Sequence, residues 1–341
     1  MSERRAFLDA SPGERRGVVT LDGLPERLWI ERAGEAERAQ FGARHRGRIV
    51  EVLRDAGLAY VDIGVDPRGV MKLGGTTGHL NQGASVEVEV IAESRGGKGP
   101  AVRFMGSGAG RPELIAASPD IEERLAAAAP GAPVIRGAEA RDAADDAQAS
   151  ALEVFHQLSG GVTLAIEATR ALVAIDVDFA DQAGTARKAM DANLRAVRQA
   201  ARLLRLKAIG GTVVIDLIGF PQHPAPLQEA ARAAFAADQP GVSVLPVSRL
   251  GLLQIAKPHR ETPLTERLVE ADGRLSARTI AQNLVRALER QGAADPLARP
   301  VAACSTEVAA LLRPLVAELG PRFGVTEELG WTRLKTDIRF T

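Results

Sequence analysis

Cysteine is almost absent from this chain, and no long hydrophobic run occurs in it. A single cysteine, Cys304, among 341 residues excludes an intrachain disulfide and a cysteine-based zinc site. We expect this side chain to be a buried small hydrophobe. No apolar stretch approaches the roughly 18–20 residues that span a bilayer, and the first ten residues lack the apolar core of a signal peptide. We therefore expect a soluble globular protein of the reducing cytoplasm, with no membrane contact.

Net charge is absent as well, since 43 Lys and Arg residues balance 43 Asp and Glu residues. A neutral chain is a poor candidate for strong non-specific binding to nucleic acid over its whole surface. Only six of the basic residues are lysines, so the distribution of the arginines decides whether a local basic surface exists. The length predicts two or three domains, each with its own core.

Two kinds of catalytic motif are also missing. No GxxxxGK[ST] or GxGxxG loop stands between an expected strand and an expected helix, which makes nucleotide-driven chemistry unlikely. The five histidines form no HxxH or HExxH pair, so nothing supports a zinc hydrolase.

The first third of the chain reads as short β-strands. Residues 16–32 predict a hairpin around an Asp-Gly turn. Five further short strands follow between residues 46 and 104, and Val86, Val88 and Val90 alternate with glutamates as in a half-buried strand. A small closed barrel is the expected result, and an OB-fold is the natural candidate.

The rest of the chain alternates strands and helices. Residues 106–150 read as a connector with one or two weak helices that lack a strong apolar stripe. Beyond it the pattern predicts a mixed α/β layer, with strands at 162–167, 171–177, 212–220 and 242–247 and helices at about 187–208 and 225–237. A small α/β subdomain is expected at the end, with helices at about 276–291 and 305–318 and strands at 300–303, 323–327 and 337–340.

Two aspartates end apolar strands of the same expected sheet. Asp176 follows the run 172–175, Asp216 follows the run 212–215, and Asp178 points to the same side as Asp176 along an extended chain. Open α/β sheets place their ligand sites at such strand ends. Converging carboxylates repel one another, and Mg²⁺ relieves that repulsion while binding waters and phosphate oxygens. The alternative is that these aspartates cap loops or pair with arginines.

Basic and aromatic residues supply candidate contacts to nucleic acid. Arg195, Arg198, Arg202 and Arg205 share one face of the helix between the two aspartates, where they can hold a phosphate backbone or form an ordinary solvated surface. In the barrel, Tyr60 is the only tyrosine of the chain and can stack a base or belong to the core.

The residues around these aspartates resemble the ribonuclease E/G family of bacterial endoribonucleases. The resemblance rests on LSGGVTLAIEATRALVAIDVDFA (158–180), NLRAVRQAARLLRLKAIGGTVVIDLIGF (193–220) and VSRLGLLQIAK (247–257). The segment 47–73, with the GGKGP turn, resembles the same family's OB-type RNA-binding domain. The parts 16–32 and 276–341 resemble its terminal parts, so that about two-thirds of the chain is covered.

The resemblance implies roles for individual residues. Asp176 and Asp216 would hold a catalytic Mg²⁺ that activates water for attack on an RNA phosphodiester, with Asp178 as a further catalytic candidate. Tyr60 would stack a base and Lys98 would contact the RNA backbone, and the basic helix face with Arg249 would extend this surface. The α/β layer would be DNase-I-like.

The chain also departs from the family pattern. Asp178 stands where the family has Asn, Gly219 where it has a second Asp, and Val70 where the barrel has a second aromatic residue. No cysteine occurs in 257–267, so the zinc link is missing and any homo-oligomer must use another surface. The connector is too short for the family's 5′-end sensor and ribonuclease-H-like insertions, so no preference for a 5′-monophosphate is expected.

These observations define a hypothesis with alternatives. We expect an N-terminal hairpin segment (1–38), an OB-fold RNA-binding domain (39–107), a connector (108–157), an α/β catalytic domain (158–268) and a small C-terminal α/β subdomain (269–341). The expected activity is Mg²⁺-dependent cleavage of single-stranded RNA. The alternatives are an RNA-binding protein of the same fold that has lost efficient cleavage, and an unrelated metal-dependent phosphohydrolase.

Overall fold

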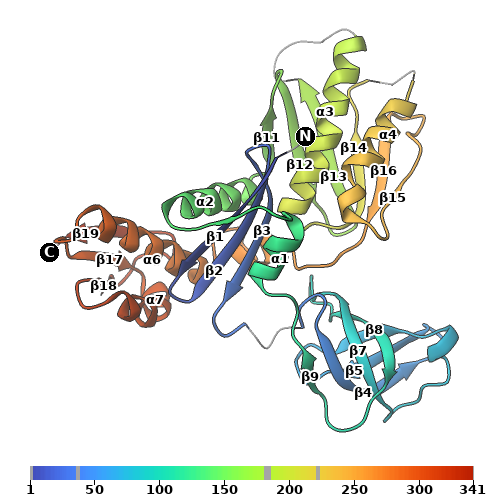
Figure 1. The fold of residues 1–341 in the computed structure, drawn as a ribbon, viewed down its shortest axis with the longest axis horizontal. Coiled ribbons are helices and arrows are strands. Elements are labelled where there is room, and N and C mark those ends of the chain that lie inside the picture. The colour runs from blue at the N-terminus through green and yellow to red at the C-terminus, as the bar shows by residue number, and fades with distance from the viewer. Residues whose placement is uncertain (1–2, 36–38, 180–185, 220–222, 341) are drawn as a thin grey trace.

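A small sheet at the N-terminus forms the centre of the molecule, and three lobes surround it (Figure 1). The computed structural model describes residues 3–35, 39–179, 186–219 and 223–340. The central sheet has the strand order β10-β1-β2-β3, formed by β1 (Arg4–Ser11), β2 (Glu14–Leu21), β3 (Leu24–Arg32) and β10 (Val134–Ile135). The predicted hairpin is confirmed: Asp22 and Gly23 both have positive φ in its turn, as a two-residue hairpin loop requires. Strand β1, which pairs with β2, was not predicted.

The first lobe is the expected barrel. Its strands are β4 (Arg44–Leu53), β5 (Leu58–Asp62), β6 (Gly69–Lys72), β7 (Ser85–Ala92) and β8 (Ala101–Ser107), with a 3-10 turn at Gly75–Thr77. They pair in the cyclic order β4-β5-β6-β8-β7-β4, so the sheet closes on itself, and β9 (Glu113–Ala116) adds to β4 from outside. Val86, Val88 and Val90 are fully buried in its core, as their alternation with glutamate predicted.

The expected connector packs on the central sheet. Helices α1 (Ile121–Ala128) and α2 (Ala138–Leu152) confirm the two weak helices. However, α2 buries Ala140, Ala144, Ala147 and Ala151 in the largest core of the molecule. Four alanines at this spacing form a stripe of their own, and their small side chains let the helix approach the sheet closely. The stripe escaped notice in the sequence because alanine carries little hydrophobic signal.

The second lobe is the predicted α/β layer, a mixed sheet with the order β11-β12-β13-β14-β16-β15. Helices α3 and α4 cover one face of it (Figure 1). The elements are β11 (Phe155–Leu158), β12 (Val162–Ala168), β13 (Val173–Phe179), α3 (Ala186–Leu206), β14 (Gly211–Asp216), α4 (Ala225–Ala234), a 3-10 turn (Ala236–Asp238), β15 (Ser243–Val244) and β16 (Leu252–Lys257). The expected strand 212–220 therefore ends at Asp216, residue 220 lies outside the described residues, and β16 was not predicted as a strand.

The third lobe follows the short helix α5 (Leu264–Leu268) and has the predicted element order. It contains α6 (Ala277–Ala294), β17 (Pro300–Cys304), α7 (Thr306–Leu319), β18 (Gly324–Glu327) and β19 (Asp337–Phe340). Cys304 is fully buried, as expected of a small hydrophobe. Within the described ranges, none of the helices combines the length and apolar character that a membrane span requires.

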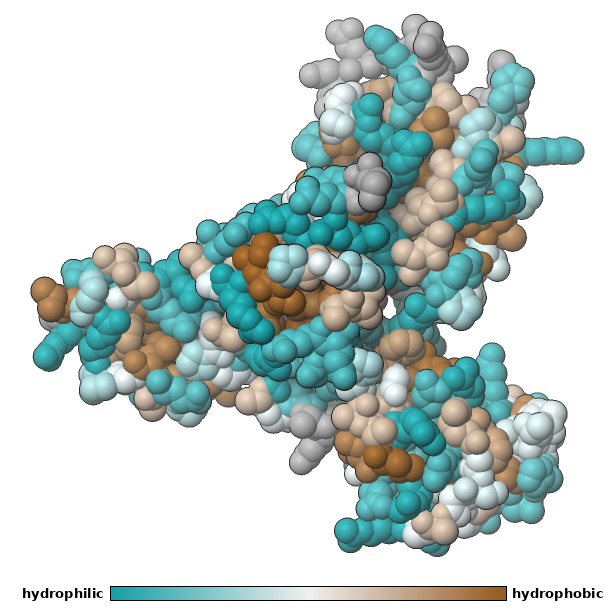
Figure 2. All heavy atoms as spheres, viewed as in Figure 1, coloured by the Kyte–Doolittle hydropathy of each residue, from teal (hydrophilic) through white to brown (hydrophobic). Residues whose placement is uncertain are grey.

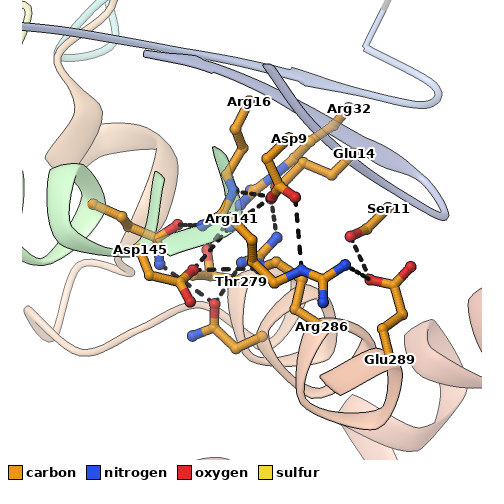
Figure 3. A network of polar contacts seen from close by, with 12 residues as sticks. Asp9, Ser11, Glu14, Arg16, Arg32, Arg141, Asp145, Thr279, Arg286 and Glu289 are labelled. Atoms are coloured by element: carbon orange, nitrogen blue, oxygen red, sulfur yellow. Dashed lines mark hydrogen bonds and ion pairs between the residues drawn. The ribbon is translucent and has the colours of Figure 1, made fainter. Parts of the chain in front are cut away.

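Buried charges join this lobe to the central sheet (Figure 3). Glu14 of β2 accepts hydrogen bonds from Arg32 of β3 at 2.6 Å and from Arg286 of α6 at 2.5 Å. Arg16 of β2 pairs with Asp9 of β1 at 2.7 Å and with Asp145 of α2 at 2.8 Å. The sheet, α2 and α6 thus meet at one network of ion pairs that water hardly reaches.

Candidate active site

The two strand-end aspartates lie side by side. β13 and β14 run parallel, and their register makes Asp176 the direct partner of Asp216. Parallel strands are about 4.8 Å apart, so the two side chains leave neighbouring backbones in the same direction. Asp178 lies two residues beyond Asp176 on the same face of β13. The structure therefore brings together the three carboxylates that the sequence singled out.

These carboxylates occupy the open face of the sheet. Val173, Ile175 and Val177 are buried in the core that β13 shares with α3, and the aspartates between them are exposed. Asp216 is likewise exposed next to the buried Ile215. The expected crevice is thus a surface open to solvent, which a polymer can reach.

Electrostatic repulsion within the cluster is visible in the pKa of Asp176. Partial burial raises the pKa of this carboxyl above its ordinary value, and the negative charges of Asp178 and Asp216 raise it further. The Asp178 carboxylate is partly satisfied, because its Oδ1 accepts a hydrogen bond of 2.7 Å from the backbone N–H of Phe179. A cation at this face would relieve the repulsion.

The donor set fits Mg²⁺ only in part. Across the residues that the structure describes, no three or more His, Cys, Asp or Glu side chains form a cluster that could hold a metal ion. Mg²⁺ is commonly held by one or two carboxylates, with waters and phosphate oxygens completing its coordination. Asp176 and Asp216 match this requirement, whereas a site built from protein ligands alone does not fit.

A buried asparagine holds the chain that follows Asp216. Asn193 of α3 is 1% exposed, accepts a 2.9 Å hydrogen bond from the N–H of Ile218 and donates a 3.0 Å bond to its carbonyl. Both backbone groups of Ile218 are therefore fixed by one side chain. We had not singled out Asn193, although a lone polar residue beside the buried Ala192 and Val197 on the helix is a signal that the sequence contains.

Arg249 lies in a rigid turn beside this segment. The Ser248 hydroxyl accepts hydrogen bonds from the N–H groups of Leu250 and Leu252, both at 3.2 Å, and Leu252 is the antiparallel partner of Asp216. Gly219, at a positive φ of 63°, packs its carbonyl against Gly251 of the turn. Arg249 is exposed in this turn, which leads directly into the strand that pairs with Asp216.

The basic face of α3 is mostly internal, which corrects our expectation. Arg202 and Arg205 are 7% and 5% exposed, because the helix is enclosed between its own sheet and β3. Arg205 pairs with Glu26 at 2.9 Å and with Asp238 at 2.8 Å, and Arg202 bonds to Gln199 and to the carbonyl of Pro25. Arg195 donates to the carbonyl of Ser159. Of the four arginines only Arg198 is exposed, so Arg202 and Arg205 do not form an RNA-binding surface.

The barrel residues are placed as follows. Tyr60 is half-buried on β5, and its cross-strand partner on β6 is Val70, the position at which the family pattern has an aromatic residue. Lys98 is exposed in a turn closed by two backbone hydrogen bonds with Arg95. This turn is docked, since the N–H of Gly96 donates to Glu266 of α5 at 3.0 Å.

The segment that carries these features is similar to known proteins. The family model described as "Ribonuclease E/G family" matches residues 119–260, which include both aspartate strands, α3 and the Ser248 turn. Over this segment, which is less than half of the chain, the protein is similar to the ribonuclease E/G family. The resemblance inferred from the motifs is thereby confirmed.

The match to individual relatives covers a limited part of each. Ribonuclease E of Haemophilus influenzae is 33% identical over 122 residues, which make up 34% of this chain and 13% of that protein. The chloroplastic ribonuclease E/G-like protein of Arabidopsis thaliana is 35% identical over 133 residues, 35% of this chain and 13% of the relative. For ribonuclease E of Escherichia coli K12 the identity is 32% over 122 residues, 34% of this chain and 12% of that protein. The chain thus matches about an eighth of the length of these relatives.

Proposed function

We propose that this protein is an endoribonuclease that cleaves single-stranded RNA, with Mg²⁺ held by Asp176 and Asp216. The observation that carries the proposal is the parallel pairing of these two aspartates on an exposed sheet face inside the segment that matches the ribonuclease family. An open face suits a substrate that is a long polymer. The relatives are named as ribonucleases, which supports RNA as the substrate class.

Different residues would have different roles in hydrolysis. When bound, a divalent cation supplies a water of lowered pKa and stabilises negative charge on the scissile phosphate. Asp176 and Asp216 fix the position of that charge because each side chain is set by a strand of the same sheet. Asn193 keeps the chain after Asp216 in place through both backbone groups of Ile218. Arg249, exposed on its rigid turn, is available to neutralise a neighbouring phosphate.

The closed barrel supports binding of the same substrate. Its strands pair in a closed cyclic order, and we propose that the barrel is of the OB type, a fold that binds oligonucleotides on its strands and loops. In this proposal Tyr60 stacks a base on the outer surface of β5, and Lys98 contacts the backbone at the exposed turn. Arg198 adds one phosphate contact on α3.

Cleavage is tested by removing the two paired carboxylates. Purified protein with Mg²⁺ is expected to cut an A/U-rich single-stranded RNA internally, and the Asp176→Asn/Asp216→Asn variant is expected to lose cleavage while still binding the RNA. The matched control is Asp142→Asn/Asp146→Asn, which removes two exposed carboxylates from α2 and should retain full activity. Equal cleavage by the protein and the Asp176/Asp216 variant, or by neither, would contradict the proposal.

Stacking by the barrel is tested separately. Tyr60→Ala should weaken RNA binding by about 1–3 kcal/mol if the ring stacks a base, whereas Tyr60→Phe should bind almost as tightly because the ring is retained. Fluorescence anisotropy with a labelled RNA measures both. Unchanged affinity of a folded Tyr60→Ala variant would assign the ring to packing alone.

A second candidate function is RNA binding without efficient cleavage. Two observations favour it: Asp178 adds a third negative charge to the pair, and Gly219 replaces a further carboxylate at the segment beside the Ser248 turn. RNA binding that depends on Tyr60, together with no cleavage by any variant in Mg²⁺, would identify this function.

A further inference from the structure

The barrel meets the rest of the molecule through a narrow contact (Figure 2). Glu93, at the end of β7, accepts hydrogen bonds of 3.0 Å from both the N–H and the hydroxyl of Thr262. The turn 95–98 rests on α5 through Gly96 and Glu266. The residues that follow β16 therefore contact the barrel. They lie next to Lys257 at the end of β16, whereas Asp216 pairs with Leu252 at its beginning.

A small hollow lies beside this contact. Its volume is about 30 Å³, and it is lined by residues of β3, α3, the 3-10 turn 236–238 and the segment 257–261. This space admits a small ion or group and excludes a sugar or a base. The lining residues are Arg27, Arg205, Ala208, Asp238, Lys257, Pro258, Arg260 and Glu261.

The charges around the hollow do not balance. The Asp238 side chain is 4% exposed and pairs with Arg205 at 2.8 Å, with Lys257 at 3.5 Å and with Arg27 at 3.9 Å. Arg205 has a second partner in Glu26, whereas Lys257 and Arg27 make no other ion pair among the described residues. The other carboxylate, Glu261, is occupied by the indole N–H of Trp29 and by Arg124. Within the described part of the chain, the guanidinium of Arg27 makes no hydrogen bond, although this side chain is only 23% exposed.

Desolvation without full pairing is costly for these cations. Burial lowers the pKa of Lys257 and of Arg27 below their ordinary values, and Asp238 only partly opposes this. The positive charge of Arg27 lowers the pKa of Lys257 further. An additional anion would offset the cost at both side chains.

His259 lies next in the chain to Pro258 and Arg260, which line the hollow, although it is not itself a lining residue. Its ring packs against Gly211, and its buried Nδ1 has no hydrogen-bond partner among the described residues. Burial, followed by the charges of Arg95, Lys257 and Lys98, lowers its pKa to about 4, so the imidazole is neutral at neutral pH. A neutral imidazole with its proton on Nδ1 can donate to an anion without adding charge. Arg95 and Lys98 come from the barrel turn, so the barrel contributes to the positive charge around His259.

We propose that this hollow is a phosphate-binding site, in which Arg27 and Lys257 hold one phosphate group between β3 and the α/β lobe. The size of the hollow selects a single phosphate, and the unshared donors of Arg27 and Lys257 supply the recognition. The group is either free phosphate or a phosphate of the RNA strand. The inference goes beyond the cleavage site and does not depend on catalysis.

Calorimetry with inorganic phosphate tests the site directly. Titration is done at constant ionic strength, with phosphate replacing chloride, so that general screening does not contribute. The protein should bind one phosphate, and Arg27→Gln/Lys257→Gln should bind at least tenfold more weakly. The matched control Arg111→Gln/Arg232→Gln removes the same charge from exposed positions and should bind as the unaltered protein does. No binding by the unaltered protein, or equal binding by the Arg27/Lys257 variant, overturns the proposal.

Two further measurements keep the test decisive. If the Arg27/Lys257 variant does not fold, the imidazole resonances of His259 in the unaltered protein should still shift with phosphate while those of the exposed His79 stay in place; no shift at His259 contradicts the site. RNA affinity is then measured in the Asp176→Asn/Asp216→Asn background. The site binds a phosphate of the RNA if inorganic phosphate weakens RNA binding in this background and no longer weakens it when Arg27 and Lys257 are also replaced. Phosphate binding that leaves RNA affinity unchanged indicates free phosphate, and either result can be obtained whether or not the protein cleaves RNA.

Discussion

At the scale of single residues, the aspartate cluster stores electrostatic repulsion on an exposed surface. A native carboxyl with a raised pKa binds its proton more tightly than the unfolded chain does, so stability falls as pH rises from the unfolded pKa through the native one. Asp176 therefore lowers stability once the pH exceeds both its unfolded and its native pKa. Active sites commonly carry such a cost, because the charges are arranged for a ligand.

Asp178 makes the larger charge contribution to this repulsion, which leads to a prediction. Asp178→Asn should lower the pKa of Asp176 towards its ordinary value, and should do so more than Asp216→Asn does, because the Asp178 charge raises it more strongly. Carbon-detected NMR titration of the Asp176 carboxyl measures both shifts, with the exposed Asp142→Asn as the control that leaves the titration unchanged. An unchanged pKa in Asp178→Asn would show that the two side chains do not interact.

At the scale of elements, α3 shows how one row of arginines acquires different roles. The helix lies between its own sheet and β3, so its arginines meet protein on several sides. Arg205 binds two buried carboxylates, Glu26 and Asp238, while Arg198 remains in solvent. Helical spacing alone does not distinguish the two, because the distinction depends on what packs around the helix.

Substitutions on α3 separate these roles. Arg205→Gln should destabilise the protein by about 3–5 kcal/mol because it leaves buried carboxylates short of a partner. Arg198→Gln should change stability by no more than about 0.5 kcal/mol, and should reduce the salt dependence of RNA binding by about one phosphate contact. Urea denaturation and a salt titration of RNA affinity measure these effects. A mild stability loss in Arg205→Gln would indicate that water replaces its ion pairs.

At the scale of the whole molecule, the central sheet connects the lobes through buried charge (Figure 3). Burial by itself would raise the pKa of Glu14, but Arg286 of the C-terminal lobe and Arg32 of β3 hold it below its ordinary value. A carboxyl with a lowered native pKa stabilises the fold above its unfolded pKa. This contribution is lost as pH falls through the native pKa.

The attachment of the C-terminal lobe can be tested through this network. Arg286→Met should cost about 3–5 kcal/mol at neutral pH, since Glu14 keeps only Arg32 as a charged partner. The loss should be smaller at acid pH, where Glu14 is protonated. The control Arg290→Met removes a half-exposed partner of Asp145 and should cost at most about 1 kcal/mol. Urea titrations at neutral and acid pH provide the comparison, and equal costs at both pH values would contradict the role assigned to Glu14.

Local patterns were sufficient for much of the fold. The alternation at Val86, Val88 and Val90 predicted a strand because side chains on a strand repeat every two residues. Apolar runs ahead of Asp176 and Asp216 predicted two strands that end in carboxylates, and the structure pairs them. Strand β16 and the alanine stripe of α2 were not recognised, since their short or weakly hydrophobic patterns carry little local signal.

By itself the sequence determined the order of elements, the similarity to the ribonuclease E/G family and the aspartate pair, because periodicity, motifs and strand-end position are properties of consecutive residues. Only the tertiary structure decided which charges reach solvent. It placed Arg202 and Arg205 inside the protein, and it brought Arg27 of β3 and Lys257 of β16 together at one hollow. Burial and charge balance depend on neighbours that are distant in the chain, and these neighbours are set only when the lobes pack together.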